Sequence, residues 1–370
     1  VDVGTSGCRA LAIDRSGRLV ANARAPLAPS SRPRAGWSEQ RPDDWWRAVS
    51  KVLGAIAEHR EGQLRGLCID ATSSTLLLAD RHGAALTAGL MYDDRRAEEA
   101  AGRVARVAPP ESAARGPGSA LSKLLHLVRD APPEGASHAL HQADWLSGML
   151  TGRFGIADEN NALKLGYDPV DRRWPEWFNA LPEVTKLLPH VVPAGTPLGT
   201  IDPRVAADLG LPSTLTIVAG TTDSNAATLA AGIDRPGEAV TSLGSTLVVK
   251  LFSDHPIFAA RYGVYSHRIG DHWLTGGASN SGGAVLRQYF SDSELEQLSR
   301  QIDYIVYSSG YVTNLATIST LVGKGDWVIS DKLNHASIVD GCSLARGQFV
   351  RFRHNDMEQL ERMLSETPVD

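Results

Sequence analysis

Alternating apolar and polar positions open the chain and predict strands. The first 27 residues, VDVGTSGCRALAIDRSGRLVANARAPL, contain three such runs, separated by the polar turns GTSG and DRSGR. Alternation with a period of two is typical of half-buried strands, and Gly-rich polar stretches are typical of turns. The opening therefore predicts a three-stranded meander.

Helical spacing follows the meander. Residues 42–60, PDDWWRAVSKVLGAIAEHR, begin with Pro and Asp and carry apolar residues every three or four positions, whereas 64–80, LRGLCIDATSSTLLLAD, read as an apolar strand. Residues 94–150 are predicted to be mainly helical, ending at Gly152, and LTIVAGTTDS at 215–224 returns to a strand. Because strands alternate with helices, the fold class is α/β.

The order of the amino terminus recurs about 240 residues later. EAVTSLGSTLVVKLFS, 238–253, is again a strand, a Gly-hydroxyl turn and a strand, which suggests two related lobes. The corresponding turn residues are Gly4, Thr5 and Ser6 in the first copy and Gly244, Ser245 and Thr246 in the second. Such turns present N–H groups and hydroxyls that can cradle phosphate oxygens. The alternative is a pair of ordinary hairpins.

Composition and net charge limit the number of domains and the kinds of binding partner. A chain of 370 residues with 42% hydrophobic content can bury a substantial core in two or three domains. The net charge of -5 and the pI near 6.1 argue against nucleic acid or a membrane surface as the main partner. Cys8, Cys68 and Cys342 lack metal-ligand spacing, so we expect neither zinc nor a disulfide framework, and a reducing, cytoplasmic compartment.

One aspartate stands out in AGTTDSNAATLAAG, residues 219–232. Asp223 lies between a Gly-Thr-Thr turn and a run of small residues, which permit close approach of a docking group. A carboxylate in this place could serve chemistry. The alternative is a helix N-cap, because Asp before an Ala-rich segment commonly accepts hydrogen bonds from the first free N–H groups.

Six motifs, in this order and spacing, resemble the FGGY carbohydrate kinases, which have the actin-like ATPase (ribonuclease H-like) two-lobe fold. They are DVGTSGCR at 2–9, WSEQRPDDWW at 37–46, DDRR at 93–96, DWLSGMLTG at 144–152, GTTD at 220–223 and SLGST at 242–246. The likeness extends to about residue 303, and NALKLGYDP at 161–169 is similar to the plant and cyanobacterial D-ribulose kinase branch. It implies phosphoryl transfer from ATP to a sugar hydroxyl.

The resemblance also implies roles for the candidate residues. Asp223 matches the general base, which accepts the proton of the attacking hydroxyl. Asp2 matches the acid that holds Mg²⁺ near the transferred phosphate, mostly through water, and so borders the substrates; its alternative is a surface aspartate. The two Gly-hydroxyl turns would face the ATP phosphates from opposite lobes.

Three further residues fall where this family contacts or frames a polyol. They are Ser73, Asp94 and Arg96. Asp94 and Arg96 could instead form a surface ion pair. Tyr92 replaces the tryptophan usual before this aspartate, which puts substrate stacking in doubt. Trp37, His141 and Gln142 are expected to pack in the interior or to frame the site.

A different family begins after LSRQID at 298–303. Residues 305–368 resemble the PLP-dependent α-oxoamine synthases, closest to the serine palmitoyltransferase branch. The likeness implies that Gly310 and Tyr311 bind the cofactor phosphate and that His335 stacks on its ring. The family's Schiff-base lysine motif is missing, and Lys324 and Lys332 lie in other segments, so we expect an appended fragment without this chemistry.

These observations predict a composite chain. We expect an amino-terminal kinase lobe at 1–231, a partial and truncated carboxy-terminal lobe at 232–303 and a short α/β synthase fragment at 304–370. The predicted function is an ATP- and Mg²⁺-dependent pentulose kinase, with D-ribulose as first choice. We expect it to be impaired because the family's adenosine-binding segment is unmatched. The alternatives are a non-catalytic sugar-binding remnant and a fragment of a PLP-dependent acyl-CoA condensing enzyme.

Overall fold

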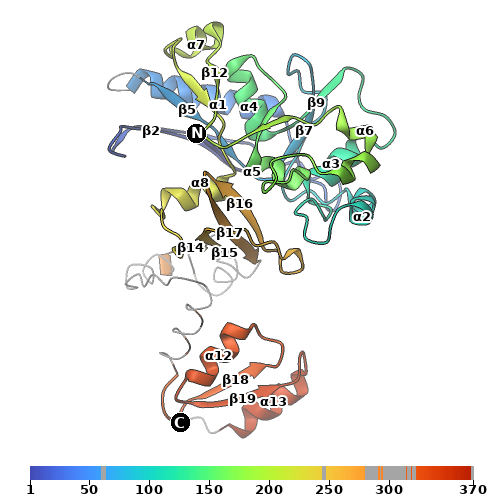
Figure 1. The fold of residues 1–370 in the computed structure, drawn as a ribbon. Helices are drawn as coiled ribbons and strands as arrows, with labels where there is room; N and C mark the ends of the chain where they lie inside the picture. Colours follow the sequence, from blue (N-terminus) through green and yellow to red (C-terminus); the bar gives the residue numbers. More distant parts are fainter. Residues whose placement is uncertain are drawn as a thin grey trace. The chain divides into compact units, whose positions relative to one another are not determined.

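The computed structural model describes residues 1–59, 64–243, 247–279, 291, 293–294, 314, 318 and 322–367. Two compact units divide the chain: Val1–Gly232 with Asp254–Gly277, and Ile233–Ser253 with Ala278–Asp370 (Figure 1). Among the helices in these ranges, none has the length and apolar character needed to cross a bilayer.

The predicted meander is confirmed. Strands β1 (Asp2–Val3), β2 (Gly7–Ile13) and β3 (Leu19–Pro26) join β6 in a sheet of order β3-β2-β1-β6. Burial alternates along β2, and its buried residues lie under helix α1 (Pro42–His59), whose bounds match the prediction (Figure 1). Helix α1 covers them with a helically spaced apolar face: Trp45, Val49, Val52, Leu53 and Ile56.

The single strand predicted for 64–80 is wrong, because the chain turns in its middle. It forms β5 (Gly66–Cys68), β6 (Asp70–Ala71) and β7 (Leu76–Asp80). Between β6 and β7 lies a turn, Thr72–Thr75, which we call the sugar loop after the role that the resemblance implies for Ser73; its Ser74 has φ +66°. The hydroxyls of Thr72 and Thr75 bond one another at 2.6 Å, so local side-chain hydrogen bonds replace the strand ladder here.

The segment predicted as mainly helical also contains a strand. Helices α2 (Glu98–Val107), α3 (Ala120–Leu127) and α4 (Gln142–Thr151) are confirmed, and Gly152 ends α4 with φ +68° as predicted. The missed strand is β9 (Ala136–His141), in the sheet of order β4-β8-β7-β9 with β4 (Glu39–Gln40) and β8 (Gly89–Leu90).

A third sheet of the first unit has the order β12-β13-β5. Strand β13 (Thr216–Val218) runs parallel to β5 and antiparallel to β12 (Pro197–Thr200), and leads into helix α8 (Asp223–Ala230), as the sequence predicts. Further elements of this unit are β10 (Ile156–Asp158), α5 (Glu159–Ala162), α6 (Pro182–Thr185), β11 (His190–Val192), α7 (Pro203–Leu209) and β16 (Tyr265–Ile269). Strand β17 (His272–Ser279) belongs to it as far as Gly277.

The second unit contains the predicted second strand-turn-strand. Strands β14 (Ala239–Leu243) and β15 (Leu247–Ser253) pair antiparallel, while the turn Gly244–Thr246 lies outside the described residues. Farther on, β18 (Trp327–Asp331) and β19 (Gln348–Phe352) pair in parallel, joined through α12 (Ala336–Leu344) and followed by α13 (Met357–Glu366). This is a β-α-β unit.

Candidate active site

Asp223 is the first residue of helix α8. The N-cap is Thr222, so the N-cap alternative for Asp223 is wrong by one position. Oδ1 of Asp223 accepts a hydrogen bond from the N–H of Ser224 at 2.7 Å, and the side chain is half-buried. The positive end of the helix dipole favours a negative charge in this place. Asp223 is thus a fixed and partly accessible carboxylate.

Two further carboxylates lie on neighbouring parallel strands. Asp2 of β1 lies opposite Asp70 of β6, and the next residue of β6, Ala71, forms a parallel bridge with Thr222. Asp2, Asp70 and Asp223, which we call the acidic cluster, therefore lie on adjacent parallel segments.

Gly220 explains the glycine of the GTTD motif. A Cβ built on Gly220 would lie 1.8 Å from the main-chain oxygen of Ile69. Only glycine permits this approach of the turn to the strand that carries Asp70. The motif thus brings Asp223 beside the other two acids by close backbone packing.

Electrostatics mark the cluster as a place for a cation. Burial, together with the negative charges of Asp2 and Asp223 and against the positive charge of the amino terminus, raises the pKa of Asp70 to about 7. A divalent cation would relieve this repulsion. In the described part of the chain, however, no three acidic, His or Cys side chains are arranged to ligate a metal directly.

The buried side-chain amides of Asn160 and Asn225 bind the GTTD turn through Thr221. Nδ2 of Asn160 donates to Oγ1 of Thr221 at 3.1 Å and to the main-chain oxygen of Arg268 at 3.0 Å. Nδ2 of Asn225 donates to the same Thr221 hydroxyl at 3.2 Å. Sequence reasoning missed Asn160; its signal is the polar run DENN at 158–161, in which Asp158 caps α5 through the N–H groups of Asn160 and Asn161.

The first predicted phosphate turn, Gly4–Gly7, is held through its carbonyl groups. The N–H of Gly4 donates to the oxygen of Gly7 at 3.0 Å, and the oxygen of Ser6 accepts from Leu27 at 2.9 Å. Gln40 donates to the oxygen of Thr5 at 2.8 Å. The turn therefore has one conformation, with Ser6 exposed. Its predicted counterparts Gly244, Ser245 and Thr246 lie outside the described residues.

The sugar loop contains hydroxyls that lack partners. Oγ of Ser73 and Oγ of Ser74 are both buried without a hydrogen-bond partner among the described residues, and so is Nε2 of Gln142. Each unpaired buried polar group costs about 1–3 kcal/mol, so such groups mark a place where a polar ligand would be favoured. Oε1 of Gln142 accepts from Thr72 at 2.8 Å, which makes it a framing residue, as expected.

Asp94 and Arg96 form an internal ion pair, so the surface alternative is wrong. Asp94 is fully buried and the Arg96 side chain is 5% exposed. Oδ2 of Asp94 accepts from Nη2 of Arg96 and from the N–H of Ser38, both at 2.6 Å. Arg96 also bonds Glu39 at 2.6 Å and lies 3.7 Å above the centre of the Trp37 ring. The Asp94 carboxylate is therefore engaged within the protein and frames the site.

Lys123 is a functional candidate that sequence reasoning missed. Its Nζ donates to the main-chain oxygens of Ser74 at 2.9 Å and Met91 at 2.7 Å, and the side chain is fully buried. Burial lowers the pKa of Lys123 to about 7, against the opposing charge of Asp94. The residue ties the sugar loop to the segment that carries Asp94. A lysine on an otherwise apolar helical stretch, ALSKLLHL, is the signal that could have found it.

Tyr92 lies within electrostatic range of Asp223, the predicted base. Burial raises the pKa of Tyr92, and the charges of Asp93 and Asp223 raise it further. The half-exposed phenol therefore lies within electrostatic range of Asp223. Tyr92 adjoins the Asp94 segment, so the structure brings the predicted base and the predicted polyol frame into one region.

A comparison with protein-family models identifies the family of this chain. The model of the FGGY family of carbohydrate kinases, N-terminal domain, matches residues 1–230. The chain belongs to the FGGY family of carbohydrate kinases. This confirms the resemblance drawn from the FGGY motifs.

Solved structures agree on the fold. A xylulose kinase from Rhodospirillum rubrum superposes with a TM-score of 0.72 at 22% identity, covering 88% of this chain and 67% of that one. A gluconate kinase from Lactobacillus acidophilus gives 0.71 at 17% identity, covering 88% and 65%. A kinase from Brucella ovis, described as a xyloylose kinase, gives 0.69 at 26% identity, covering 78% and 61%. The first unit therefore has the predicted actin-like sugar-kinase fold.

The carboxy-terminal segment matches another family, as predicted. The model of aminotransferase class I and II matches residues 284–370. An 8-amino-7-oxononanoate synthase from Geobacter sulfurreducens is 61% identical over 62 residues, which is 17% of this chain and 16% of that protein. A serine palmitoyltransferase from Sphingomonas paucimobilis is 44% identical over 99 residues, 25% and 24%. The chain thus spans a quarter or less of these two synthases.

The predicted cofactor residues of this segment are only partly described. Gly310 and Tyr311 lie outside the described residues. His335 is the N-cap of α12, where its Nδ1 accepts from the N–H of Ser337 at 3.2 Å and lies 2.7 Å from the Ser337 hydroxyl. In this structure the His335 ring caps a helix.

Proposed function

We propose that this chain is an ATP-dependent pentulose kinase in which Asp223 is the general base. One observation carries the proposal: a half-buried carboxylate at the start of α8 adjoins Asp2 and Asp70 on one side and lies within electrostatic range of Tyr92 on the other. A base, a cation-attracting cluster and a polyol frame are the parts that phosphoryl transfer to a sugar requires.

The reaction uses these parts in a simple way. Asp223 accepts the proton of the sugar hydroxyl, and the oxygen of that hydroxyl bonds to the γ-phosphorus of ATP. The bond between the γ-phosphorus and the β-γ bridging oxygen breaks, which releases ADP. The turn Gly4–Gly7 offers N–H groups and hydroxyls to the phosphate oxygens. The resemblance implies a phosphate-binding role for Gly244, Ser245 and Thr246 as well, and these residues lie outside the described part of the chain.

Mg²⁺ would be held near Asp2 and Asp70. Bound there through water, it would neutralise charge on the phosphate groups. The raised pKa of Asp70 supports this placement, because its cause is burial together with nearby negative charge. The chain's own contribution is to fix these carboxylates opposite one another on adjacent parallel strands.

The sugar would bind at the sugar loop. The partnerless hydroxyl of Ser73 is available to a substrate hydroxyl, and the Asp94–Arg96 pair keeps the surrounding segment rigid. D-ribulose is our first choice on the resemblance of 161–169 to the ribulose kinase branch. Two solved structures similar to this chain are described as a xylulose kinase and a gluconate kinase, and both of these substrates carry several hydroxyls, as ribulose does.

A second candidate function, sugar binding without phosphoryl transfer, is favoured by the distribution of the candidate residues over the two units. Every described sugar-binding candidate lies in the first unit, whereas the second phosphate turn belongs to the second unit. The kinase family model ends at residue 230 and the aminotransferase model begins at 284. We therefore propose turnover far below that of an intact kinase, and the limiting case is a protein that binds the sugar without phosphorylating it.

The test is ADP release from Mg-ATP with D-ribulose, D-xylulose or no sugar, beside calorimetric sugar titrations. Release that requires ribulose and is lost in Asp223→Asn supports the kinase. Ribulose binding without release supports the sugar-binding alternative. Neither binding nor release in the folded protein would refute both.

A further inference from the structure

A small cavity beside the GTTD turn is lined by two carboxylates. Asp144 of α4 and Asp158 of β10 line it together with Gly220, and its volume is about 10 Å³. Both acids are buried, since Asp158 is 2% exposed and the Asp144 side chain is 4% exposed. A space of this size holds at most one water molecule, so nothing larger would fit between the two carboxylates.

Amides and one imidazole supply the hydrogen bonds of the Asp144–Asp158 pair. Oδ1 of Asp158 accepts from the N–H groups of Asn160 and Asn161 at 2.9 and 3.0 Å, and Oδ2 accepts from Nδ2 of Asn161 at 2.6 Å. Oδ2 of Asp144 accepts from the N–H of His141 at 3.1 Å and lies 2.9 Å from Nδ1 of the same residue. Among the described residues, no lysine or arginine forms an ion pair with either carboxylate.

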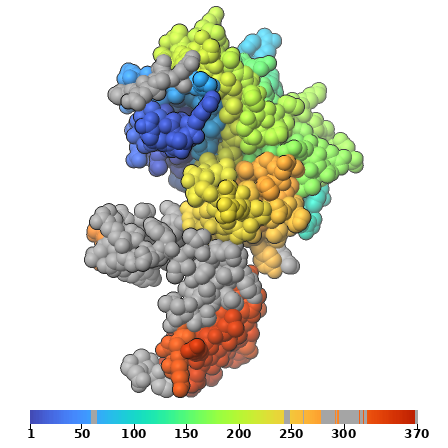
Figure 2. All heavy atoms as spheres, turned by 60° about the vertical axis from the view of Figure 1, so that its left-hand side comes forward, coloured from blue at the N-terminus to red at the C-terminus, as the bar shows by residue number. Residues whose placement is uncertain are grey.

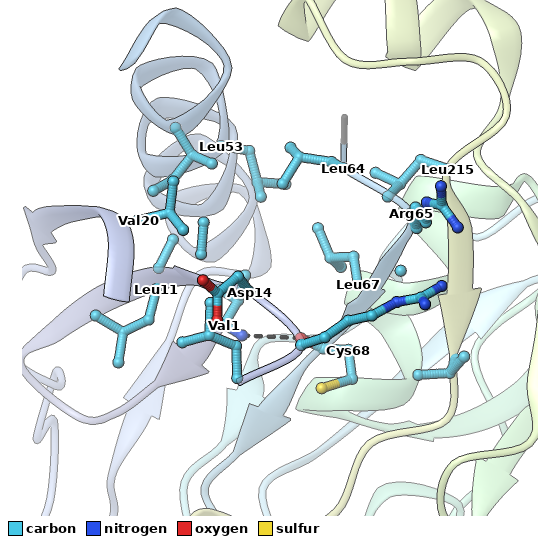
Figure 3. A pocket seen from close by; sticks show the side chains of 17 residues that line it. Val1, Leu11, Asp14, Val20, Leu53, Leu64, Arg65, Leu67, Cys68 and Leu215 are labelled. Atoms are coloured by element: carbon cyan, nitrogen blue, oxygen red, sulfur yellow. Dashed lines mark hydrogen bonds between the residues drawn. The ribbon is translucent and has the colours of Figure 1, made fainter. Parts of the chain in front are cut away.

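Asp14 shows the different surroundings of an accessible aspartate in the same unit. It lines the cavity of about 700 Å³ beside Val1 (Figure 3), and Arg18 pairs with it at 3.1 Å. Strand β2 and the turn after it form part of the blue surface of the first unit (Figure 2), so water reaches this ion pair. The Asp144–Asp158 pair has neither a lysine or arginine partner among the described residues nor such access to water.

Two buried carboxylates without such a partner are stable together only if one of them is neutral. Burying an unpaired charge costs so much free energy that the group takes up a proton instead. Burial, together with the charge of Asp144 and against the hydrogen bonds of Asn161 and the charge of His141, raises the pKa of Asp158 to about 7. Geometry and electrostatics therefore assign the proton to Asp158.

The other ionisable groups on the elements around β10 lie away from the cavity. Glu159 of α5 pairs with Arg172 at 3.1 Å, and His190 of β11 is exposed. Strand β16, which packs against α5, carries His267 and Arg268. None of these five side chains lines the cavity, so the balance between the two carboxylates is set mainly within the pair.

Asp158 is connected to the GTTD turn through Asn160. The N–H of Asn160 donates to Asp158, while its Nδ2 donates to Oγ1 of Thr221 at 3.1 Å. Thr221 lies two residues before Asp223, and Gly220 of the same turn lines the cavity itself. A movement of Asp158 would therefore reach the turn both through Asn160 and across the cavity.

We propose that Asp158 is a positioning residue that holds a proton in the folded chain, and that release of this proton to solvent loosens the GTTD turn. Oδ2 is the place for the proton, because Oδ1 already accepts from two N–H groups. Oδ1 of Asn161 is buried without a hydrogen-bond partner among the described residues, and turning this amide over would bring it against the proton. After release, two negative charges would border one small cavity, and their repulsion would push β10 and α5 away from α4.

Infrared difference spectra of the parent chain and Asp158→Asn test the proton directly. At about pH 5 the parent should show the carbonyl stretch of a protonated carboxylic acid that the variant lacks, and the difference should fade as the pH rises through about 7. Asp144→Asn removes the neighbouring charge and should move this fading to lower pH. Absence of the difference band, or an unchanged midpoint in Asp144→Asn, would overturn the proposal.

Amide exchange of residues 219–225 tests the effect on the turn. After correction for the intrinsic pH dependence of exchange, protection in the parent should fall at least about tenfold between about pH 6 and about pH 8.5, whereas protection in Asp158→Asn should stay constant. Asp202→Asn is the matched control. Asp202 caps α7 through the N–H groups of Arg204 and Val205 at 2.8 and 3.4 Å, so its variant should behave like the parent.

Both measurements use neither ATP nor sugar, so they decide this proposal even if the kinase assay fails. The consequence for catalysis rests on the proposed function, because it acts through the turn that carries Asp223. Protection that changes equally with pH in the parent and in Asp158→Asn would show that the turn does not depend on this proton.

Discussion

Asp2 and Asp70 lie directly opposite one another in the parallel strands β1 and β6, with Asp223 following the next parallel segment. This arrangement brings like charges together on adjacent strands. Burial and these charges raise the pKa of Asp70 to about 7, and the positive charge of the amino terminus offsets only part of the effect. In the proposed kinase, a cation bound here would relieve the repulsion.

Asp70→Asn should change how stability depends on pH. An exposed Asp has a pKa near ~3.9, so the folded chain binds the Asp70 proton more tightly than the unfolded chain. Its stabilising effect is complete below about pH 4 and is lost as the pH rises through about 7. Relative to their difference at pH 4, the variant should gain about 1–3 kcal/mol over the parent at pH 8, after allowance for solvent screening.

Urea unfolding of both proteins at pH 4 and pH 8 measures this gain. Millimolar Mg²⁺ should stabilise the parent at pH 8 more than the variant. A constant difference across the pH range would show that Asp70 titrates as an ordinary exposed acid.

Lys123→Met should loosen the sugar site. The change leaves the oxygens of Ser74 and Met91 without their buried donor, so we expect a loss of about 2–4 kcal/mol in the free energy of unfolding at pH 7. The dissociation constant for sugar should rise as well, because Lys123 joins the sugar loop to the Asp94 segment. Lys51→Met, on the exposed side of α1, is the control and should change neither. Equal effects of the two substitutions would contradict the assigned role.

Gly220→Ala tests the close approach behind Asp223. A methyl group there would lie 1.8 Å from the oxygen of Ile69, so the turn must move, and we expect a loss of about 2–4 kcal/mol in unfolding free energy. Gly54→Ala, within α1, meets no atom within 4 Å and should stabilise by up to about 1 kcal/mol. Thermal unfolding of both variants decides the point, since a neutral Gly220→Ala would mean that the turn is adaptable.

Much of the first unit could be predicted from sequence because its signals are local. Alternation gives β2 and β3, helical spacing gives α1, and the GTTD turn precedes a helix that begins at Asp223. Local signals failed where tertiary contacts decide. The run Thr72–Thr75 looks strand-like, yet its hydroxyls bond one another and turn the chain. Strand β9 is stable because it pairs with β7, a long-range contact that no local pattern reports.

The residues of the candidate site fall into the same two groups, those that a local motif predicts and those that only tertiary contacts reveal. Asp223 and Asp94 belong to recognisable motifs, although the burial of Asp94 could not be foreseen. Asp70, Lys123 and Asn160 act through partners far away in sequence: Asp2, the oxygen of Met91 and the oxygen of Arg268. Only the folded chain shows that these residues support the sugar loop and the base.

The most direct test of the account is ribulose-dependent ADP release by the parent chain and by Asp223→Asn. The substitution keeps the side-chain oxygen that accepts from Ser224 but removes the base, so the account predicts a residual release that falls about 10²- to 10⁴-fold while Tm and ribulose binding stay unchanged. Release that survives Asp223→Asn at the parent rate would contradict the assignment of Asp223 as the catalytic base.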